Sequence, residues 1–378
     1  MNEKNRVLAI GMVDSEHFAR WLSGACGSGF AITIMPSGPN RRVHPVIRKL
    51  LKDHPHIFDM SEALAKWSMV IWIVDRIASE RVRGHVIRKH LEKPFDVIHF
   101  HEMQSGGYPL RHVPNGQIGK RLVVYTPYGS DLFWFQKYPQ HRRKISAILR
   151  LTDAIFPECE RDLVIAKELG FRGKELNTLP ASGWRQIAEN PNLPFTQRNK
   201  VVIKAYGGKW GEIEKVISVL SQSKSLLETY ELHFVSTSII TAMRIRTQFR
   251  SSPLRLVIHR KYSLSFEDML RLFSEAKYYI ALSKSDGFPA SLFEAVSNGA
   301  IPIQSNTACI PKSLEEISPE NFISPNHPMK IIELLRFYEK SEILAKKISN
   351  DFMIWSHKNQ HLKSALPDIL LSAYNVKT

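Results

Sequence analysis

Short apolar runs alternate with longer amphipathic segments along most of the chain, and this alternation is the feature that most constrains the fold. The runs are rich in Val and Ile, whereas the segments between them have helical periodicity. Such an alternation is typical of βαβ units, whose strands form parallel sheets. The runs are 7–12, 31–35, 97–101, 122–126 and 154–156 in the first half and 201–205, 231–236, 255–259, 278–282 and 301–304 in the second. The sequence therefore predicts an α/β protein whose two α/β halves follow one another.

A stretch dense in Pro, Asn and Gly, from Leu179 to Pro194, separates the two series of runs. Such a composition is typical of a linker. A chain of 378 residues also suits two domains of about 150–200 residues each. We predict an N-terminal domain over 1–184 and a C-terminal domain over 185–351. A final helix over about 352–378 is expected to pack back on the first domain.

The chain is strongly basic, with 52 Lys and Arg against 36 Asp and Glu and a net charge of +16. This charge indicates an anionic partner, which could be nucleic acid, a phospholipid surface or a phosphorylated substrate. Basic clusters in the first half are either solvated helix faces or contacts to an anionic membrane. They are Arg41-Arg42, Arg48-Lys49, Arg81 with Arg83, Arg88-Lys89 and Arg142-Arg143-Lys144.

Targeting and cysteine patterns favour a cytoplasmic protein. The three cysteines lie far apart without a Cys-x-x-Cys pair, which argues against a zinc site and against a disulfide framework. The N-terminal apolar run continues into Asp14-Ser-Glu-His17 without a cleavage site, so it is interpreted as a strand and not as a signal peptide. The longest other apolar run, Trp67–Val74, is less than half of the ~20 residues that a spanning helix needs.

The most informative segment is 281–305. A strand leads into a polar loop at Gly287, Pro289 supplies the φ angle favoured in the first turn of a helix, and Gly299 ends that helix. Unpaired N–H groups from about Ala290 to Phe293 would then point beyond the carboxyl end of the strand. In an open α/β sheet ligands bind at that edge, and a phosphate suits it electrostatically.

Two carboxylates flank this group of amides. Asp286 lies in the loop and Glu294 in the helix, eight positions later. Each carboxylate can accept hydrogen bonds from a pair of hydroxyls, as from a sugar diol at one end and a ribose diol at the other, with a diphosphate between them. Alternatively, Asp286 closes a turn and Glu294 is a solvated helix residue.

The segment resembles the donor-binding signature of retaining GT-B glycosyltransferases of family 4, whose Glu-x7-Glu motif is here Asp286-x7-Glu294. In particular, it resembles a subgroup with Asp-Gly at this place. The resemblance implies two Rossmann-like domains whose parallel sheets face each other across a cleft. It also implies that Asp286 is catalytic and holds hydroxyls of the transferred sugar, while Glu294 holds the ribose. The other donor-binding residues would be Gly287, Phe288, Pro289, Ala290, Ser291 and Leu292.

The resemblance extends to three pieces of the first half, 14–21, 96–108 and 126–132. It implies that Asp131 is catalytic and faces the reaction from the side opposite the donor. The acceptor-side residues would be His17, His101, Tyr128 and Ser130. Without the resemblance, Asp131 is interpreted as a helix cap and His101 as a core residue. The chain departs from the family at Tyr128, where many members have a His that contacts the donor sugar; a Tyr cannot carry positive charge near pH 7.

Negative charge develops on the nucleoside diphosphate as it leaves the sugar, and cations are needed to stabilise that charge. GT-B enzymes commonly have an Arg and a Lys five positions apart after the first strand of the second domain, and this chain has Lys204 and Lys209 there. We expect Lys209, on a turn with Gly207 and Gly208, to be the catalytic cation, with Lys204 as a second donor-binding cation. In the Asp-Gly subgroup an Arg follows this turn, and Glu212 stands in its place.

No Asp-x-Asp pair is present. Since the GT-A enzymes use such a pair to hold a divalent cation, we expect no metal and no cofactor beyond a UDP- or GDP-linked sugar as co-substrate. The family picture is a front-face displacement with retention, in which the departing phosphate helps to deprotonate the acceptor.

The sequence as a whole predicts a retaining glycosyltransferase that moves a hexose-class sugar to a glycan or lipid-linked glycan in bacterial-type synthesis of lipopolysaccharide, O-antigen or capsule. With a lipid-linked acceptor, the first half would rest on the inner face of the cell membrane. Three alternatives stay open. They are another GT-B nucleotide-sugar enzyme such as an epimerase, an inactive relative marked by Glu212, and a basic nucleic-acid-binding protein, for which no nucleic-acid motif is present.

Overall fold

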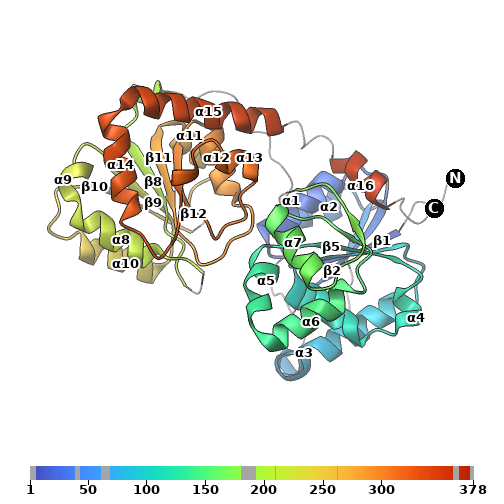
Figure 1. The fold of residues 1–378 in the computed structure, drawn as a ribbon. Helices are drawn as coiled ribbons and strands as arrows, with labels where there is room; N and C mark the ends of the chain where they lie inside the picture. Colours follow the sequence, from blue (N-terminus) through green and yellow to red (C-terminus); the bar gives the residue numbers. More distant parts are fainter. Residues whose placement is uncertain are drawn as a thin grey trace. The chain divides into compact units, whose positions relative to one another are not determined.

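The predicted apolar runs pair with one another as parallel strands in a computed structural model, which describes residues 6–38, 43–60, 69–179, 193–208, 210–261, 263–360 and 366–374. The chain divides into two compact units (Figure 1). Unit 1 comprises 1–184 together with 362–378, and unit 2 comprises 185–361. The boundary segment 180–192 lies outside the described residues.

Unit 1 contains a seven-stranded parallel sheet with the order β3-β2-β1-β4-β5-β6-β7. Its strands are β1 (Arg6–Gly11), β2 (Ala31–Pro36), β3 (Phe58–Met60), β4 (Val97–His101), β5 (Leu122–Thr126), β6 (Ala154–Ile155) and β7 (Lys174–Glu175). The strand order reverses between β1 and β4. In open α/β sheets, ligands bind at the carboxyl ends of the strands that flank such a reversal.

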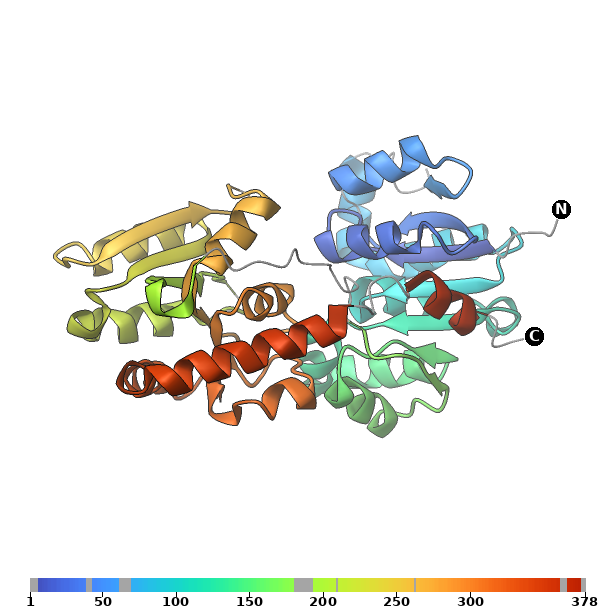
Figure 2. The same ribbon diagram turned by 90° about the horizontal axis from the view of Figure 1, so that it is seen from above.

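Helices cover both faces of this sheet (Figures 1 and 2). They are α1 (Glu16–Ala25), α2 (Pro45–Asp53), α3 (Met69–His90), α4 (Asn115–Ile118), α5 (Ser130–Phe133), α6 (Pro139–Leu149), α7 (Glu160–Glu168) and α16 (Leu366–Tyr374). Successive residues of β1 alternate between two cores. Val7 and Ala9 pack with α1, α2 and α16, whereas Leu8 and Ile10 pack with α3, α6 and α7. A strand covered on both faces is apolar throughout, which explains why these strands appear as continuous apolar runs in the sequence.

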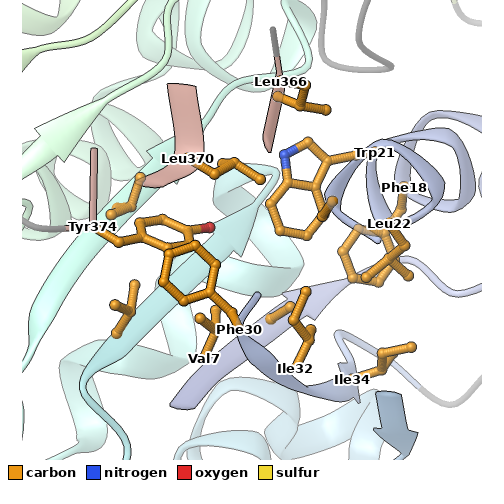
Figure 3. Close-up of a cluster of buried hydrophobic side chains, with 14 of the residues drawn as sticks. Val7, Phe18, Trp21, Leu22, Phe30, Ile32, Ile34, Leu366, Leu370 and Tyr374 are labelled. Atoms are coloured by element: carbon orange, nitrogen blue, oxygen red, sulfur yellow. The ribbon is translucent and has the colours of Figure 1, made fainter. Parts of the chain in front are cut away.

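The last helix, α16, completes the core of unit 1 (Figure 3). Leu370 packs on Trp21 and its neighbours, and the Tyr374 hydroxyl lies 2.7 Å from Nδ1 of His99 in β4. The predicted terminal helix over about 352–378 is thus corrected in part. Residues up to Gln360 belong to α15 (Glu342–Gln360), a helix of unit 2, and among the described residues α16 alone packs back on unit 1.

Unit 2 contains a six-stranded parallel sheet with the order β10-β9-β8-β11-β12-β13. Its strands are β8 (Lys200–Lys204), β9 (Glu231–Thr237), β10 (Arg255–Arg260), β11 (Ala276–Ala281), β12 (Ile301–Ser305) and β13 (Phe322–Ile323). Its other helices are α8 (Ile213–Gln222), α9 (Lys224–Leu227), α10 (Ile239–Gln248), α11 (Phe266–Ser274), α12 (Ala290–Ser297), α13 (Lys312–Glu315) and α14 (Lys330–Lys340). The order of this sheet reverses between β8 and β11. The predicted fold class, α/β with two parallel sheets, is confirmed.

Membrane-spanning helices were also sought. Within the described ranges, no helix combines the length and the apolar character that crossing a bilayer requires.

The first prediction concerns α16. Leu370 is 0% exposed and its neighbour Leu371 is 38% exposed. We expect Leu370→Ala to lower the free energy of unfolding of unit 1 by about 2–4 kcal/mol, because it leaves a cavity among buried side chains. Hydrogen exchange of the β1 amides under native conditions measures this loss. The matched control Leu371→Ala should change it by less than about 0.5 kcal/mol. Equal effects of the two variants would contradict the packing of α16 on unit 1.

Candidate functional site

A charged pair bridges the reversal of strand order in unit 2. Lys204 is the last residue of β8, and Asp286 lies in the loop after β11. The Lys204 Nζ donates to Oδ2 of Asp286 at 3.0 Å, and the two side chains are 25% and 31% exposed. Open α/β sheets bind ligands at the carboxyl ends of the strands where the strand order reverses, and this pair occupies that position.

The charged side chains at this edge influence the hydroxyl of Tyr279, a residue of β11. Burial raises its pKa, Lys204 lowers it, and the carboxylates of Asp286 and Glu294 raise it further. The hydroxyl lies 2.8 Å from Oγ of Ser291. The predicted donor-binding residues Lys204, Ser291 and Glu294 and the predicted catalytic Asp286 thus all influence Tyr279, and Ser291 contacts it directly. Motif reasoning missed this tyrosine, although a Tyr inside a buried strand needs a polar partner and so carries a signal.

Lys204 keeps its charge in this setting. Burial disfavours the ammonium, but the adjacent Asp286 carboxylate outweighs burial and raises the pKa of Lys204 above its usual value. Lys204 ends β8, a central strand that lies between β9 and β11 in the sheet.

The helix α12 begins at this edge. Pro289 precedes its first turn with φ −75° and ψ 111°. Its carbonyl accepts hydrogen bonds from the N–H groups of Leu292 at 2.9 Å and Phe293 at 3.3 Å. The expectation of unpaired N–H groups from 290 to 293 was therefore wrong for these two, because the first turn closes on Pro289. No acceptor in the described part of the chain pairs with the N–H groups of Ala290 and Ser291.

The remaining predicted donor-binding residues of this segment are largely inaccessible. Gly287, Phe288 and Pro289 are buried in the loop, and Leu292 is fully buried in the core. Glu294 is also buried, at 7% exposure, so it is not the solvated helix residue of the alternative interpretation.

The opposite end of α12 is anchored by Arg198, which sequence reasoning missed. Its guanidinium donates to the carbonyl oxygens of Asn298 at 2.9 Å, Ala276 at 3.3 Å and Leu193 at 3.0 Å. Burial lowers the pKa of Arg198 to about 10. A cation at the C-terminus of a helix also interacts favourably with the helix dipole. Arg198 thus holds the helix that carries Glu294, and nothing in its local sequence indicates this role.

A glycine-rich turn follows β8. Gly208 has φ +81°, and a Cβ at Gly211 would overlap the carbonyl oxygen of Tyr206, so both positions require glycine. Gly207 is partly exposed beside Thr241. Lys209, the predicted catalytic cation, lies outside the described residues.

Glu212 ends this turn, where the resemblance implies an Arg. Its carboxylate is buried and pairs with Nζ of Lys215 at 3.2 Å and with Nζ of Lys284 at 3.6 Å. Its N–H donates to the carbonyl of Leu282 at 3.0 Å, and the N–H of Lys284 donates to the carbonyl of Trp210 at 2.8 Å. The loops after β8 and β11 are therefore joined, and the negative charge of Glu212 is balanced by two lysines.

The predicted acceptor-side residues gather at the corresponding edge of the sheet in unit 1. His17 follows β1, His101 ends β4 and Tyr128 follows β5. The centroid of the Tyr128 ring lies 5.6 Å from that of His17 and 6.1 Å from that of His101. Ser130 is half-buried at the start of α5, and its N–H donates to the carbonyl of Tyr128 at 2.9 Å.

Two histidines of β4 stack with ring centroids 4.4 Å apart. His99 is a satisfied core residue, because its ring nitrogens lie 2.7 Å from the Tyr374 hydroxyl and 2.8 Å from the Thr126 hydroxyl. His101 is fully buried beside Trp21, and neither of its ring nitrogens has a hydrogen-bond partner among the described residues. Burial lowers the pKa of His101 well below 6.5, so its ring is neutral at pH 7.

The carboxylate of Asp131 links several residues at this edge by hydrogen bonds. Its Oδ2 accepts from Met103 N–H at 2.9 Å and from the Tyr125 hydroxyl at 2.8 Å, and its Oδ1 accepts from the N–H groups of Tyr128 at 2.8 Å and Leu132 at 3.0 Å. Burial raises the pKa of this carboxyl, although the four donors oppose the rise. With its acceptor sites occupied, Asp131 orders the loops after β4 and β5, which is a positioning role.

Sequence reasoning also missed Glu102, which follows β4 with a positive φ of 69°. Its carboxylate accepts from the N–H groups of Gln104 at 2.8 Å and Ser105 at 2.6 Å. Burial and the nearby charge of Asp131 raise the pKa of Glu102 to about 7. A positive φ in a residue other than glycine is backbone strain, and such strain clusters at functional sites.

Solved structures resemble the whole chain. No protein-family model matches the sequence, and no curated protein matches it. HepE of Anabaena, solved with UDP-glucose, is 11% identical over 97% of this chain and 99% of its own, with a TM-score of 0.62. Sucrose-phosphate synthase of Thermosynechococcus elongatus is 12% identical over 98% of this chain and 97% of its own, with a TM-score of 0.62. UDP-GlcNAc 2-epimerase of Neisseria meningitidis, bound to UDP-GlcNAc, is 12% identical over 97% of this chain and 99% of its own, with a TM-score of 0.59.

These similarities define the fold class. Both parallel sheets, with seven strands in unit 1 and six in unit 2, match those of GT-B proteins, and the chain has the GT-B fold.

The second prediction concerns pH. The folded pKa of Glu102, about 7, lies above its usual value of 4.5, so the folded state binds the proton more tightly. Its contribution to stability is present below about pH 4.5 and is lost as pH rises through about 7, by ~3 kcal/mol at most. In urea unfolding at a series of pH values, Glu102→Gln should have a flatter profile than the wild type across this window. Parallel profiles would contradict the raised pKa.

Proposed function

We propose that this chain is a glycosyltransferase that moves a sugar from a nucleotide-sugar donor to a glycan or lipid-linked glycan. One observation carries the proposal. At the reversal of strand order in unit 2, Lys204 pairs with Asp286, and the Tyr279 hydroxyl bonds with Ser291 at the start of α12, on the helix that carries Glu294. This set offers a cation and amide donors for a diphosphate, and carboxylates for the hydroxyls on either side of it.

We assign the donor roles as follows. The N–H groups of Ala290 and Ser291 at the start of α12 hold the diphosphate together with Lys204 and Lys209. Asp286 accepts hydrogen bonds from hydroxyls of the transferred sugar, and Glu294 accepts them from the ribose. HepE was solved with UDP-glucose, and the epimerase with UDP-GlcNAc. A UDP- or GDP-linked sugar is therefore the donor class that we propose.

The reaction that we propose retains the configuration at the sugar carbon. The bond from that carbon to the diphosphate oxygen breaks while its bond to the acceptor oxygen forms on the same face. The departing phosphate oxygen takes the proton of the acceptor hydroxyl, and the lysines stabilise the negative charge of the leaving group. In this scheme the cationic role falls to the lysines and α12, so no metal ion or other cofactor is needed.

His17, His101, Tyr128 and Ser130 would line the acceptor side in unit 1, with Asp131 ordering the loops that carry them. The basic residues Arg48, Lys49, Arg142 and Arg143 are exposed, whereas Lys144 is engaged by Glu80. Arg41 and Arg42 lie outside the described residues. The exposed cations support peripheral contact with an anionic membrane, as expected for a lipid-linked acceptor in bacterial surface polysaccharide synthesis.

The similarity to UDP-GlcNAc 2-epimerase favours a nucleotide-sugar epimerase as the second candidate. The two functions differ in the bond that reacts. An epimerase that abstracts a proton from the sugar exchanges carbon-bound hydrogen with solvent, whereas a transferase does not. Incorporation of deuterium into a nucleotide sugar during incubation in D2O would therefore favour the epimerase.

The third prediction is a donor screen. Among UDP-, GDP- and ADP-sugars, we expect the sugars linked to one of these three nucleotides to raise the melting temperature of the chain. The reason is that a ligand at about 100 times its Kd stabilises the folded state by about 2.7 kcal/mol. Thermal-shift measurements at matched ionic strength test this expectation. No shift with any nucleotide sugar, together with salt-steep binding to random RNA or DNA, would overturn the proposal in favour of a nucleic-acid-binding protein.

The fourth prediction separates the two carboxylates. Asp286→Ala should abolish transfer while the nucleoside diphosphate still binds, because Asp286 contacts the sugar. Glu294→Ala should weaken binding of the nucleoside diphosphate itself by about tenfold or more, since it removes hydrogen bonds to a charged group. Isothermal titration and a transfer assay measure both effects. Glu316→Ala, at an exposed carboxylate of the same unit, is the control and should change neither. Unchanged turnover or affinity in either test variant would remove the assignment of that residue.

A further inference from the structure

The helix α10 of unit 2 exposes three large apolar side chains. Ile239 is 60% exposed, Ile240 66% and Met243 61%. The opposite side of the helix is buried in unit 2 through Thr241, Ala242 and Ile245. Exposed apolar residues that occur singly need no explanation, but a contiguous group marks an interaction site.

Arginines border this apolar group on the helix surface. Seen along the helix axis, with about 100° per residue, Ile239, Met243 and Ile240 lie within roughly 100° of arc. Arg246 lies just beyond one edge of this arc, and Arg244 lies just beyond the other edge. Both arginines are exposed. Ile240 and Met243 also line a groove of about 530 Å³ between α10 and α8. The apolar surface therefore continues from the helix into a recess.

The surrounding segment contains no acidic residue. From residue 232 to residue 266 there is no Asp or Glu, whereas the segment contains six cations. These are Arg244, Arg246, Arg250, Arg255, Arg260 and Lys261. Five of them lie on α10, the turn after it and the edge strand β10, which contacts α10, and Lys261 directly follows β10 (Figure 1). Glu214 of α8 lies against this surface and pairs with Arg244.

We propose that α10 and β10 form a membrane-docking surface, in which Ile239, Ile240 and Met243 enter the headgroup layer of an anionic bilayer and the flanking arginines contact lipid phosphates. A helix with exposed aliphatic side chains between basic residues is typical of interfacial binding. Nucleic acid would use the arginines but would gain little from exposed isoleucines. The surface is distinct in sequence from the basic clusters of unit 1, and the inference does not depend on the glycosyltransferase proposal.

Vesicle co-sedimentation of the full-length chain tests this inference, with phosphatidylcholine vesicles that contain or lack phosphatidylglycerol. The wild type should bind the anionic vesicles. The triple variant Ile239→Ser, Ile240→Ser, Met243→Ser should bind at least about tenfold more weakly. Arg246→Gln with Arg250→Gln should weaken binding by about fivefold for each arginine. The controls are Ile343→Ser, at a residue of α15 that is 88% exposed, and Arg336→Gln, at an exposed arginine of α14; neither should change binding.

A local readout accompanies the binding assay. Hydrogen exchange of residues 239–250 should slow on anionic vesicles in the wild type and not in the triple variant. The melting temperatures of the variants should match that of the wild type, because the substituted side chains are exposed.

Three results would overturn the inference. The first is unchanged vesicle binding of the α10 variants with loss of binding in Arg142→Gln, Arg143→Gln, which would assign the contact to unit 1. The second is salt-steep RNA binding that requires Arg246 and Arg250, with no vesicle binding. The third is a concentration-dependent dimer that the triple variant abolishes, which would assign the surface to a second copy of the chain.

Discussion

The site in unit 2 depends on the pairing of β8 with β11. These strands are neighbours in space, although Lys204 and Asp286 are 82 residues apart in sequence. Their parallel pairing brings two carboxyl ends to the same edge, and the strand order reverses there, which is where open α/β sheets bind ligands. The Asp286 carboxylate raises the pKa of the Lys204 ammonium, which offsets the cost of its burial at this edge.

The helix α12 is held at both ends, which fixes its position at the edge where we propose that the donor binds. At its start the Pro289 carbonyl closes the first turn, and the N–H groups of Ala290 and Ser291 pair with no acceptor in the described part of the chain. At its end Arg198 binds the Asn298 carbonyl. A donor site must hold a diphosphate and two sugar rings in one register, and such precision comes from side chains that lock the element from behind.

In unit 1, the polar side chains at the carboxyl edge of the sheet hold loops in place by hydrogen bonds more than they contribute charge. The Asp131 carboxylate accepts hydrogen bonds from four donors, and the Met103 and Tyr128 N–H groups among them follow β4 and β5. His101 is buried among aromatic rings, and burial lowers the pKa of its ring well below 6.5.

The sequence by itself determined the α/β class, ten strands of the two sheets, and the set of residues around the start of α12, because buried parallel strands and glycine turns produce recognisable local patterns. The short strands β3, β7 and β13 were not predicted. Only the tertiary structure decided which partner each side chain has. Lys204 pairs with Asp286, and Tyr279 and Arg198 support the site. The charge of Glu212 is balanced by Lys215 and Lys284, and the carboxylate of Asp131 is saturated with hydrogen-bond donors. The physical reason is that these partners come from segments far apart in sequence. A local pattern specifies the element on which a side chain sits, but its partner depends on which strands become neighbours in the folded sheet.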